Sequence, residues 1–300
     1  MTKIDSYPNV SIIIPVYNAE KSIRLCLESL AALDYPKEKI ELIFVDNGST
    51  DDTPRIIKEY GAILVTEPKR SSYACRNRGV KSASHEIIAF TDADCVVDKD
   101  WAKNGVSLMM ENRADVVGGM ILPYRHDNAV ERFAHRNGVL DSEKAFHENK
   151  YLPTACMFTR RSIIEEVDYF DEDLISGGDL DFCWRCTLKD FRMAYSKDIL
   201  IYHIHRRNLY KLFAQNFRYG YGKFFLSKKF AFLAEERGEL GKVYRRFLAP
   251  KTFVDLIKSF LFGIKGLMAG KAGDRLFAFF SFVKVSGLFA GWKYARYKRG

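Results

Sequence analysis

Residues 10–18 read VSIIIPVYN, an apolar run, Val10–Val16, followed directly by Tyr17 and Asn18. The run is too short for a helix of ordinary length and is rich in the β-branched residues Ile and Val, which favours a strand buried on both faces. Strands of that kind occur in parallel sheets that helices cover on both sides. Residues 10–16 therefore predict a central strand, with polar side chains at its carboxyl end.

Strand-like and helix-like segments alternate over the first 120 residues. Apolar runs at 40–45, 62–65 and 86–91 predict strands, and apolar residues recur at helical spacing in 22–33, around 56–60 and in 72–84. Such alternation predicts an α/β fold with a Rossmann-like, mostly parallel central sheet flanked by helices. Ligands bind beyond the carboxyl ends of the strands in sheets of this type, so the loops after Val16, Val45 and Thr91 are candidate sites.

The rest of the chain is less regular. Residues 121–160 predict mixed loop and helix, 179–189 a helix, and 192–203 one or two short strands. From Asn208 onward the pattern is helical and increasingly apolar, and we expect breaks at Gly220, Gly222 and Pro250.

Two carboxylates follow the predicted strand 86–91, in Asp92-Ala93-Asp94. At strand-like period two both carboxylates project to the same side, where they suit a hard divalent cation that bridges substrate phosphates. The alternative is a solvated turn, because Asp is common in turns. Asp-x-Asp alone favours the turn.

A second polar loop, Asp46 to Asp52, follows the predicted strand 40–45. Asp46 is placed to accept a hydrogen bond from a base N–H at the sheet edge. The alternative is helix capping, in which Asp51 or Ser49 accepts hydrogen bonds from the first N–H groups of the next helix. Both interpretations can hold, because different residues of the loop can bind the base and cap the helix.

Several motifs together resemble the family 2 inverting glycosyltransferases. Residues 10–18 resemble their opening strand, and 41–53, ELIFVDNGSTDDT, resemble their second strand and loop. Arg76-Asn77-x-Gly79 and 88–94, IAFTDAD, follow in the family's order. FDE at 170–172 and GGDLDFCWR at 177–185 resemble the acceptor-side loop and its acidic helix start. The resemblance covers about residues 10–220.

The resemblance implies a GT-A fold and transfer of a sugar from a nucleoside-diphosphate sugar to a hydroxyl acceptor. It assigns Asp46 to the base, Arg76 to the nucleotide, and Asp92 and Asp94 to the ribose and the metal–diphosphate. The nucleotide-sugar site that it implies consists of Pro15, Tyr17, Asn18, Asp46, Arg76 and Asp92. The implied cofactor is a divalent cation, Mn²⁺ or Mg²⁺, which stabilises charge on the leaving diphosphate. A UDP sugar is slightly favoured as donor.

An inverting transfer needs a carboxylate that takes the proton of the acceptor hydroxyl. In the family this residue is the Asp of a Glu-Asp pair, which aligns with Asp179, whereas the Glu position is Gly178 here. Asp179 is favoured over Asp181, for which an i,i+4 pair with Arg185 is the alternative. Asp179 has an alternative of its own, as the cap of the helix. A second departure is Cys156, where relatives often carry Asn.

His203 and His205 lie two apart in an apparent strand and so predict a shared face. In some GT-A enzymes a His after the acidic helix completes the metal shell or contacts the diphosphate. His203 is the better candidate metal ligand, beside Asp94 and Asp92, and a structural or surface histidine is the alternative for each.

Charge is divided unevenly along the 300 residues. The chain has a formal net charge of +9, yet residues 201–300 hold 21 basic and 5 acidic residues, while residues 1–200 hold 26 and 33. Nucleic acid is disfavoured as the tail's partner, because its aromatics are mixed with Leu, Ile and Val and no RNA- or DNA-binding motif occurs.

The tail favours an anionic membrane surface as partner. Residues 253–268 have the spacing of an amphipathic helix, and 276–292 are apolar but carry Lys284 near the middle and are short for a span. Basic residues follow Trp292, an arrangement suited to lipid headgroups. We expect residues 251–300 to lie in the membrane surface or dip into it. The alternative is that these helices pack on the enzyme or form an oligomer interface.

Taken together, the sequence predicts a GT-A catalytic domain at 1–225, with a nucleotide-sugar half at 1–120 and an acceptor half at 121–225, and a helical membrane-associating extension at 226–300. Six scattered cysteines and no secretory leader favour the cytoplasmic face of the cell membrane. The expected acceptor is a lipid-linked, possibly polyprenol-linked, or cell-surface glycan precursor of polysaccharide biosynthesis. A sugar nucleotidyltransferase and a non-catalytic nucleotide-sugar-binding scaffold are the alternatives.

Overall fold

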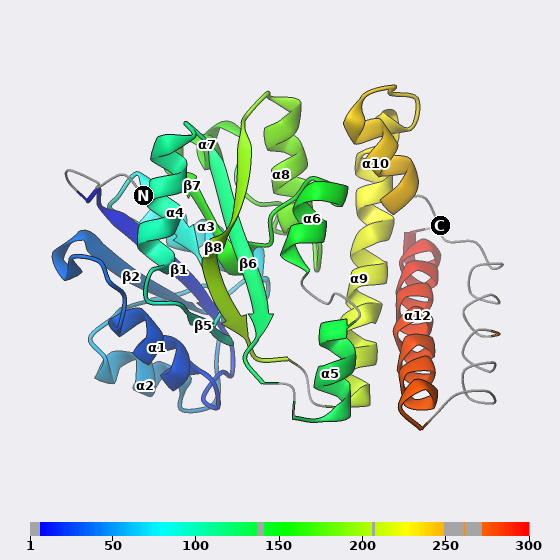
Figure 1. The fold of residues 1–300 in the computed structure, drawn as a ribbon, viewed down its shortest axis with the longest axis horizontal. Coiled ribbons are helices and arrows are strands. Elements are labelled where there is room, and N and C mark those ends of the chain that lie inside the picture. The colour runs from blue at the N-terminus through cyan, green and yellow to red at the C-terminus, as the bar shows by residue number, and fades with distance from the viewer. Residues whose placement is uncertain are drawn as a thin grey trace. The chain divides into compact units, whose positions relative to one another are not determined.

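The computed structural model describes residues 7–125, 127–136, 141–205, 208–248, 261 and 272–299 (Figure 1). The chain divides into two compact units. The sheet unit comprises Met1–Tyr124, Leu140–Asp173 and Gly178–Ile204, and the helical unit comprises Arg125–Val139, Leu174–Gly177 and His205–Gly300. The predicted boundary between residues 225 and 226 falls inside a helix of the second unit, and the functional division of the chain there stays a prediction.

The sheet unit is built on one eight-stranded sheet in the order β3-β2-β1-β4-β7-β6-β8-β5. Neighbours from β3 to β4, and the pair β6 and β8, are parallel, while β7 and β5 pair antiparallel with their neighbours. The predicted α/β class with a mostly parallel sheet is confirmed. The strands are β1 (Val10–Val16), β2 (Ile40–Asp46), β3 (Ile63–Thr66), β4 (Ile87–Phe90), β5 (Cys95–Val97), β6 (Val116–Pro123), β7 (Met157–Arg160) and β8 (Met193–His203).

Strand β1 lies between β2 and β4 and is confirmed with the predicted ends. Proline is rare in a central strand because it has no N–H to donate. Ile13 and Pro15 present their backbone groups toward β4, since residues two apart share a side, and the Ile13 carbonyl accepts from the Thr91 N–H. Pairing with β4 ends at Ile13 and Phe90, so Pro15 leaves no gap in the ladder.

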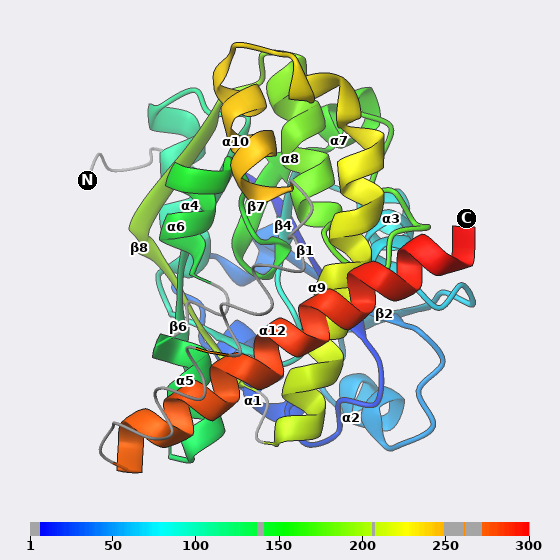
Figure 2. The ribbon, with the colours of Figure 1, turned by 90° about the vertical axis from the view of Figure 1, so that its right-hand side faces the viewer.

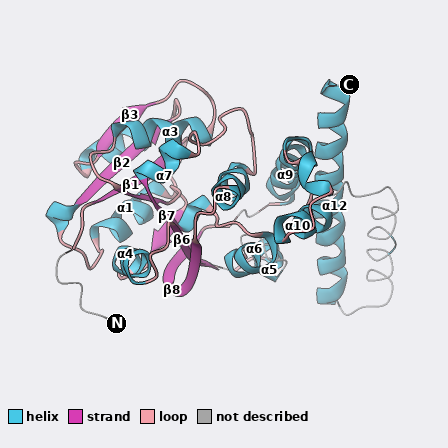
Figure 3. Ribbon diagram, turned by 90° about the horizontal axis from the view of Figure 1, so that it is seen from above, coloured by secondary structure: helices cyan, strands magenta, loops and turns pink. Residues whose placement is uncertain are grey.

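Helices cover both faces of this sheet (Figure 3). Ile12 and Ile14 share a core with Leu27 of α1 (Ile23–Ala31), on the face that α4 (Trp101–Glu111) also covers. Ile13 points the other way, to α3 (Ser72–Ser82), where a Cβ on Gly79 would lie 2.4 Å from the Ile13 Cγ2. The remaining helices of the unit are α2 (Thr53–Glu59), α6 (Ser142–Asn149), α7 (Arg161–Glu166), α8 (Gly178–Leu188) and the 3-10 turns η1 (Lys37–Lys39) and η2 (Thr154–Cys156).

Two strands, β6 and β7, lie in or beside the stretch expected to be loop and helix. Strand β6 contains Gly118-Gly119, which interrupts the apolar pattern, and β7 is only four residues long. Glycine is required at 119, because a Cβ there would lie 1.8 Å from the Ile199 carbonyl oxygen of β8. Close pairing with β8 therefore explains why β6 contains a glycine at 119, the residue type that made the strand hard to predict from the sequence.

The helical unit contains α5 (Ala129–Arg136), α9 (Leu209–Lys229), η3 (Ala231–Ala234), α10 (Glu239–Phe247) and α12 (Ala272–Arg299). Figure 2 shows α12 lying across α9. The expected breaks at Gly220 and Gly222 are wrong, because α9 continues through both. A Cβ on Gly220 would lie 1.9 Å from the Leu288 carbonyl oxygen of α12, so glycine serves close helix packing there.

The predicted amphipathic segment 253–268 and the expected break at Pro250 lie outside the described residues, apart from Leu261. The apolar segment 276–292 is part of α12, and its C-terminal half packs on α9, as the alternative interpretation of the tail expects. Within the described ranges, no helix combines the length and apolar character needed to cross a bilayer.

Candidate active site

The carboxyl ends of β1, β2 and β4 lie at one edge of the sheet. The chain builds β2 and β3 on one side of β1 and then places β4 on the other side, so the strand order reverses between β1 and β4. Ligands bind at such a switch point in α/β sheets. Tyr17, Asp46 and Asp92, which follow or end these strands, are therefore brought to the same edge, as predicted.

Asn18 ties the first two loops of this edge together. Its backbone N–H donates to the Ser49 Oγ at 2.9 Å, and its side-chain Oδ1 accepts from the Thr50 N–H at 2.8 Å. Its φ of 47° is left-handed, a conformation that Asn tolerates better than most residues. Asn18 thus holds the loop after β1 against the loop after β2.

The loop after β2 divides its polar side chains between the strand end and the start of the next helix. Both carboxylate oxygens of Asp46 accept from the Ser49 N–H, at 3.1 and 3.2 Å, and the side chain is buried at the strand end. Asp51, not Asp46, accepts from the Thr53 N–H at the start of α2, at 3.0 Å. Helix capping therefore leaves Asp46 at the edge where a base would bind.

Arg70 is a residue of this edge that the sequence reasoning missed. Its guanidinium carbon lies 3.7 Å from the centroid of the Tyr17 ring, and its Nη1 donates to the Asn47 carbonyl at 2.6 Å. The Tyr17 side chain is 48% exposed. The available signal was position, since Arg70 follows strand β3, which ends at the same edge as β1 and β2.

Arg76 and Asp92 form a short ion pair. The Arg76 Nη2 lies 2.6 Å from the Asp92 Oδ1, and the two side chains are 5% and 32% exposed. A buried guanidinium needs such a partner, because an unpaired buried charge is costly. The two residues assigned to the nucleotide are thus brought together, with part of the Asp92 carboxylate facing solvent.

The segment from Asp92 to Asp94 is a turn, so the expectation of strand-like alternation there is wrong. The Cys95 N–H donates to the Asp92 carbonyl at 3.0 Å, which closes the turn, and β5 begins directly afterwards. Ala93 is buried in the core. The two carboxylates have different partners: Asp92 pairs with Arg76, and Asp94 lies beside His203 of β8.

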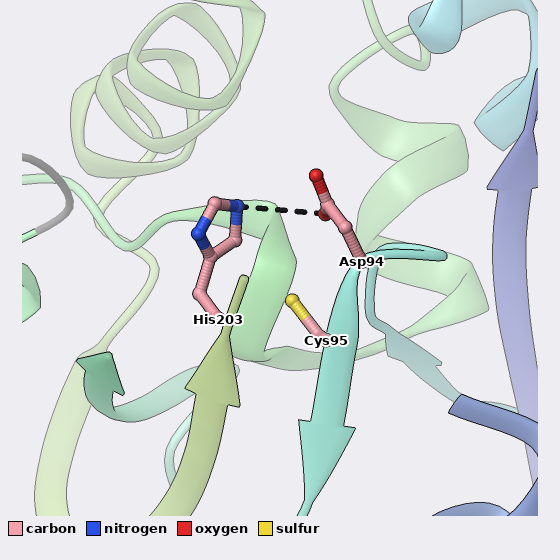
Figure 4. Close-up of side chains that lie close together, drawn as sticks. All are labelled: Asp94, Cys95 and His203. Atoms are coloured by element: carbon pink, nitrogen blue, oxygen red, sulfur yellow. Dashed lines mark ion pairs between the residues drawn. The ribbon is translucent and has the colours of Figure 1, made fainter. Parts of the chain in front are cut away.

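Asp94, Cys95 and His203 lie close together (Figure 4). The His203 Nε2 lies 3.4 Å from the Asp94 Oδ1, and Cys95 pairs with His203 in the β5–β8 ladder. One octahedral ion with ligands about 2.1 Å away holds neighbouring ligand atoms about 3 Å apart, so Asp94 and His203 fit a divalent cation. Burial and the nearby carboxylates raise the pKa of the Cys95 thiol, which disfavours the thiolate that binds metals.

The other candidate metal residues are placed differently. The Asp92 carboxylate is not part of this cluster within the described ranges, and its role as a ligand stays a prediction. His205 is buried and belongs to the helical unit, beyond the end of β8. Of the two histidines, His203 is therefore the one beside Asp94.

The two candidate bases on α8 have different surroundings. Asp181 is fully buried and pairs with Arg185 at 2.8 Å, as its i,i+4 alternative predicted. Asp179 is partly exposed at the start of the helix, where its Oδ1 accepts from the Leu180 N–H at 2.9 Å. Burial of the carboxyl raises the pKa of Asp179 to about 6, against the opposing effects of this hydrogen bond and of Arg76.

The two departures from the family pattern have structural explanations. Cys156 is buried in the core, where the Trp101 Nε1–H donates to its Sγ at 3.4 Å, so its thiol packs rather than faces an acceptor. Gly178 has no room for a side chain, since a Cβ there would lie 2.6 Å from the Tyr73 ring. Tyr73 is the second residue that the sequence reasoning missed, because its partner is 105 positions away.

Comparison with known proteins gives the family of the chain. The family model of glycosyl transferase family 2 matches residues 11–168, and the chain belongs to this family. The glycosyltransferase AglE of Haloferax volcanii is 33% identical over 225 residues, covering 72% of this chain and 73% of that protein.

Two further similarities place the fold and the activity class. A dolichyl N-acetyl-alpha-D-glucosaminyl phosphate 3-beta-D-2,3-diacetamido-2,3-dideoxy-beta-D-glucuronosyltransferase of Methanococcus voltae is 27% identical, covering 73% of this chain and 74% of that protein. The mannosyltransferase PcManGT of Pyrobaculum calidifontis, solved with GDP-Man and Mn²⁺, superposes with a TM-score of 0.73 at 18% identity, covering 99% and 89%. The chain is a glycosyltransferase with a GT-A fold.

Proposed function

We propose that this chain is an inverting glycosyltransferase in which Asp179 is the general base. The observation that carries the proposal is the placement of Asp179, partly exposed in the first turn of α8, where the pKa of its carboxyl is raised in the direction that a base working near neutral pH requires. Asp181, the competing carboxylate, is fully buried against Arg185. Asp179 is also within electrostatic reach of Arg76 and Asp92, so the base lies near the residues assigned to the donor.

The donor in this proposal is a nucleoside-diphosphate sugar held at the edge formed by β1, β2 and β4. Asp46 accepts a hydrogen bond from the base, and the exposed ring of Tyr17, backed by Arg70, offers a stacking surface. The Arg76 guanidinium offers positive charge near the diphosphate, while Pro15 and Asn18 shape the loop beneath it. A UDP sugar stays slightly favoured as donor, and the product analysis below identifies the nucleotide.

Asp94 and His203 would hold the divalent cation, Mn²⁺ or Mg²⁺. The carboxylate oxygen suits both ions, whereas the imidazole nitrogen favours Mn²⁺ over the harder Mg²⁺, and the mannosyltransferase with the similar fold was solved with Mn²⁺. Bound there, such an ion would neutralise charge on the departing diphosphate. Asp92 is proposed as its second carboxylate neighbour, through the oxygen that does not face Arg76.

The reaction proceeds in one displacement. The oxygen of the acceptor hydroxyl attacks the anomeric carbon while Asp179 takes the proton of that hydroxyl. The bond from the anomeric carbon to the diphosphate oxygen breaks in the same step. Arg76 is within electrostatic reach of Asp179 and would stabilise negative charge on the leaving group. Attack opposite the leaving group inverts the anomeric configuration.

The proposed acceptor is lipid-linked, and the proposed location is the cytoplasmic face of a membrane. The name of the Methanococcus voltae relative describes a dolichyl-phosphate-linked acceptor, which supports this class. In the helical unit, Lys293, Arg296 and Lys298 are exposed on α12 beside the exposed Tyr294 and Tyr297. Basic and aromatic side chains side by side suit an anionic headgroup layer.

Product analysis tests the proposal. The full chain is incubated with Mn²⁺, a panel of UDP- and GDP-sugars and a polyprenyl-phosphate-linked sugar acceptor, and the products are separated and examined by NMR. A nucleoside diphosphate and a glycosidic bond of inverted configuration are expected. In a parallel reaction with UTP and a sugar 1-phosphate, release of pyrophosphate would instead identify a nucleotidyltransferase. Nucleotide-sugar binding without turnover in either reaction would identify a scaffold. Retained configuration would contradict the role of Asp179.

A further inference from the structure

Position 178 carries a glycine where the resemblance places a glutamate, and the structure shows what fills that space. A Cβ on Gly178 would lie 2.6 Å from both Cε1 and Cζ of the Tyr73 ring, closer than side-chain atoms pack. Tyr73 comes from α3, on which Arg76 also lies. Helix α3 therefore contributes an aromatic ring at the start of α8.

The Tyr73 hydroxyl binds the first residue of α8. The Gly178 N–H donates to the Tyr73 Oη at 2.8 Å, and the Tyr73 side chain is 7% exposed. The first N–H groups of a helix have no partner within the helix and must be satisfied from outside. A buried N–H left without a partner is costly, so this contact fixes where α8 begins.

The ring itself packs on Phe170, which is held in turn. It stacks on Phe170, with centroids 6.2 Å apart and planes at 18°, and Phe170 in turn stacks on Phe182 of α8 at 4.7 Å. The backbone of Phe170 is fixed by Asn77 of α3, whose Oδ1 accepts from the Phe170 N–H at 3.0 Å and whose Nδ2 donates to its carbonyl at 2.9 Å. Tyr73 therefore has little freedom to move.

The contact links the donor-side and acceptor-side residues of the site. The Arg76 guanidinium lies 5.7 Å from the Tyr73 ring centroid and pairs with Asp92, while Asp179 directly follows Gly178. A base must lie within hydrogen-bond reach of the acceptor hydroxyl, and a displacement of about 1 Å costs on the order of 100-fold in rate.

We propose that Tyr73 is a positioning residue for Asp179: its ring takes the place of a side chain at position 178 and its hydroxyl fixes the Gly178 N–H, which sets the base relative to Arg76. This proposal rests on the proposed function, in which Asp179 is the base. It assigns to Tyr73 a role that needs no contact with either substrate.

Hydrogen exchange of the Gly178 amide tests the contact without any substrate. The full chain is compared with Tyr73→Phe, which keeps the ring and removes the hydroxyl, and with Tyr35→Phe. Tyr35 is a matched control, because its buried hydroxyl donates to the Pro8 carbonyl at 2.6 Å, away from α8. We expect the amide to exchange about tenfold faster in Tyr73→Phe only. An unchanged rate would overturn the proposal.

Kinetics separate positioning from a merely structural role. Nucleoside-diphosphate release from UDP-GlcNAc, UDP-glucose and GDP-mannose is followed with Mn²⁺ and an acceptor. In Tyr73→Phe we expect kcat to fall about tenfold while the donor KM stays within twofold. Tyr35→Phe lowers only thermal stability. A kcat within twofold of the parent would overturn the proposal even if the amide exchanges faster.

A double-mutant cycle tests the shared space directly. Gly178→Ala drives a methyl group into the Tyr73 ring, so we expect kcat to fall on the order of 100-fold. In the Tyr73→Ala background the ring is absent, and the same Gly178→Ala change is expected to cost less than threefold. Equal costs in both backgrounds would contradict the proposal. If the parent chain turns over no donor, the proposed function fails, whereas the exchange measurement still decides whether Tyr73 fixes α8.

Discussion

Charged side chains have different surroundings at the candidate site of the sheet unit and on α12 of the helical unit. In the sheet unit, charged side chains are buried in pairs, such as Arg76 with Asp92 and Arg185 with Asp181. In the helical unit, α12 presents Lys293, Arg296 and Lys298 to the outside, and its buried face consists of glycine, alanine and aromatic residues. Buried pairs fix geometry, whereas exposed cations offer long-range attraction that salt weakens.

This difference indicates which single substitutions should have large effects on activity or stability. Removing one member of a buried pair leaves a charge without its partner and disturbs a defined site. Removing one exposed cation changes a sum of weak attractions. The sheet unit is accordingly expected to be sensitive to single substitutions at its charged residues, and the helical unit to substitutions at its glycines.

The largest expected effect is at the Asp94–His203 pair. Asp94→Ala and His203→Ala each remove one proposed ligand, so turnover is expected to fall on the order of 100- to 1,000-fold, with weaker Mn²⁺ binding by calorimetry. Chelation of the metal from the parent chain should give a similar loss. His147→Ala, at an exposed position of α6, is the control. Full activity in both variants would show that Asp94 and His203 do not hold a metal that the reaction needs.

A smaller effect is expected at the α9–α12 contact. A Cβ on Gly291 would lie 1.9 Å from the Phe217 carbonyl oxygen, so Gly291→Ala forces the two helices apart. We expect a loss of about 2 kcal/mol in the free energy of unfolding, measured by denaturant titration. Gly238→Ala is the control, since a Cβ there meets nothing within 4 Å. Equal stability of the two variants would mean that α12 does not pack on α9.

The smallest effect per residue is expected on the exposed face of α12. Replacing Lys293, Arg296 and Lys298 by Gln should weaken binding to phosphatidylglycerol vesicles by about 1 kcal/mol per residue, about fivefold each. Lys21, Lys58 and Lys99, exposed in the sheet unit, provide a control triple of equal charge. If both triples bind equally well in a flotation assay, the membrane role of α12 is wrong.

Local patterns in the sequence predicted the parts of the fold that depend on neighbours in the chain. Strand β1 has the predicted ends, and the pairing of Asp181 with Arg185 was expected because residues four apart meet on a helix. The turn at Asp92 is the interpretation that Asp-x-Asp taken alone favoured over strand geometry. A hydrogen bond from Cys95, three residues on, decides it.

What the sequence did not predict depends on contacts across long distances in the chain. Arg70 reaches Tyr17 across the sheet edge, and Tyr73 reaches Gly178 across 105 positions. Gly220 was expected to break a helix because glycine is a poor helix former. The reason for a glycine there, the close Leu288 carbonyl of α12, lies far away in the sequence. The roles of such residues become visible only when the positions of their helices and strands in space are known.

The central claim is that Asp179 is a base held at a cost to stability. Its raised pKa means that the folded chain binds the proton more tightly than the unfolded chain, so ionised Asp179 opposes folding above about pH 6. Because the ionised form is the active one, kcat should rise with pH through about 6 and then level off.

Asp179→Asn is the most direct measurement. We predict that kcat falls on the order of 100-fold or more, that Mn²⁺-dependent donor binding is retained, and that thermal stability at pH 7.5 rises. Asp52→Asn, an exposed surface carboxylate, is the matched control and should leave kcat unchanged. An Asp179→Asn variant with the kcat of the parent chain would contradict the account.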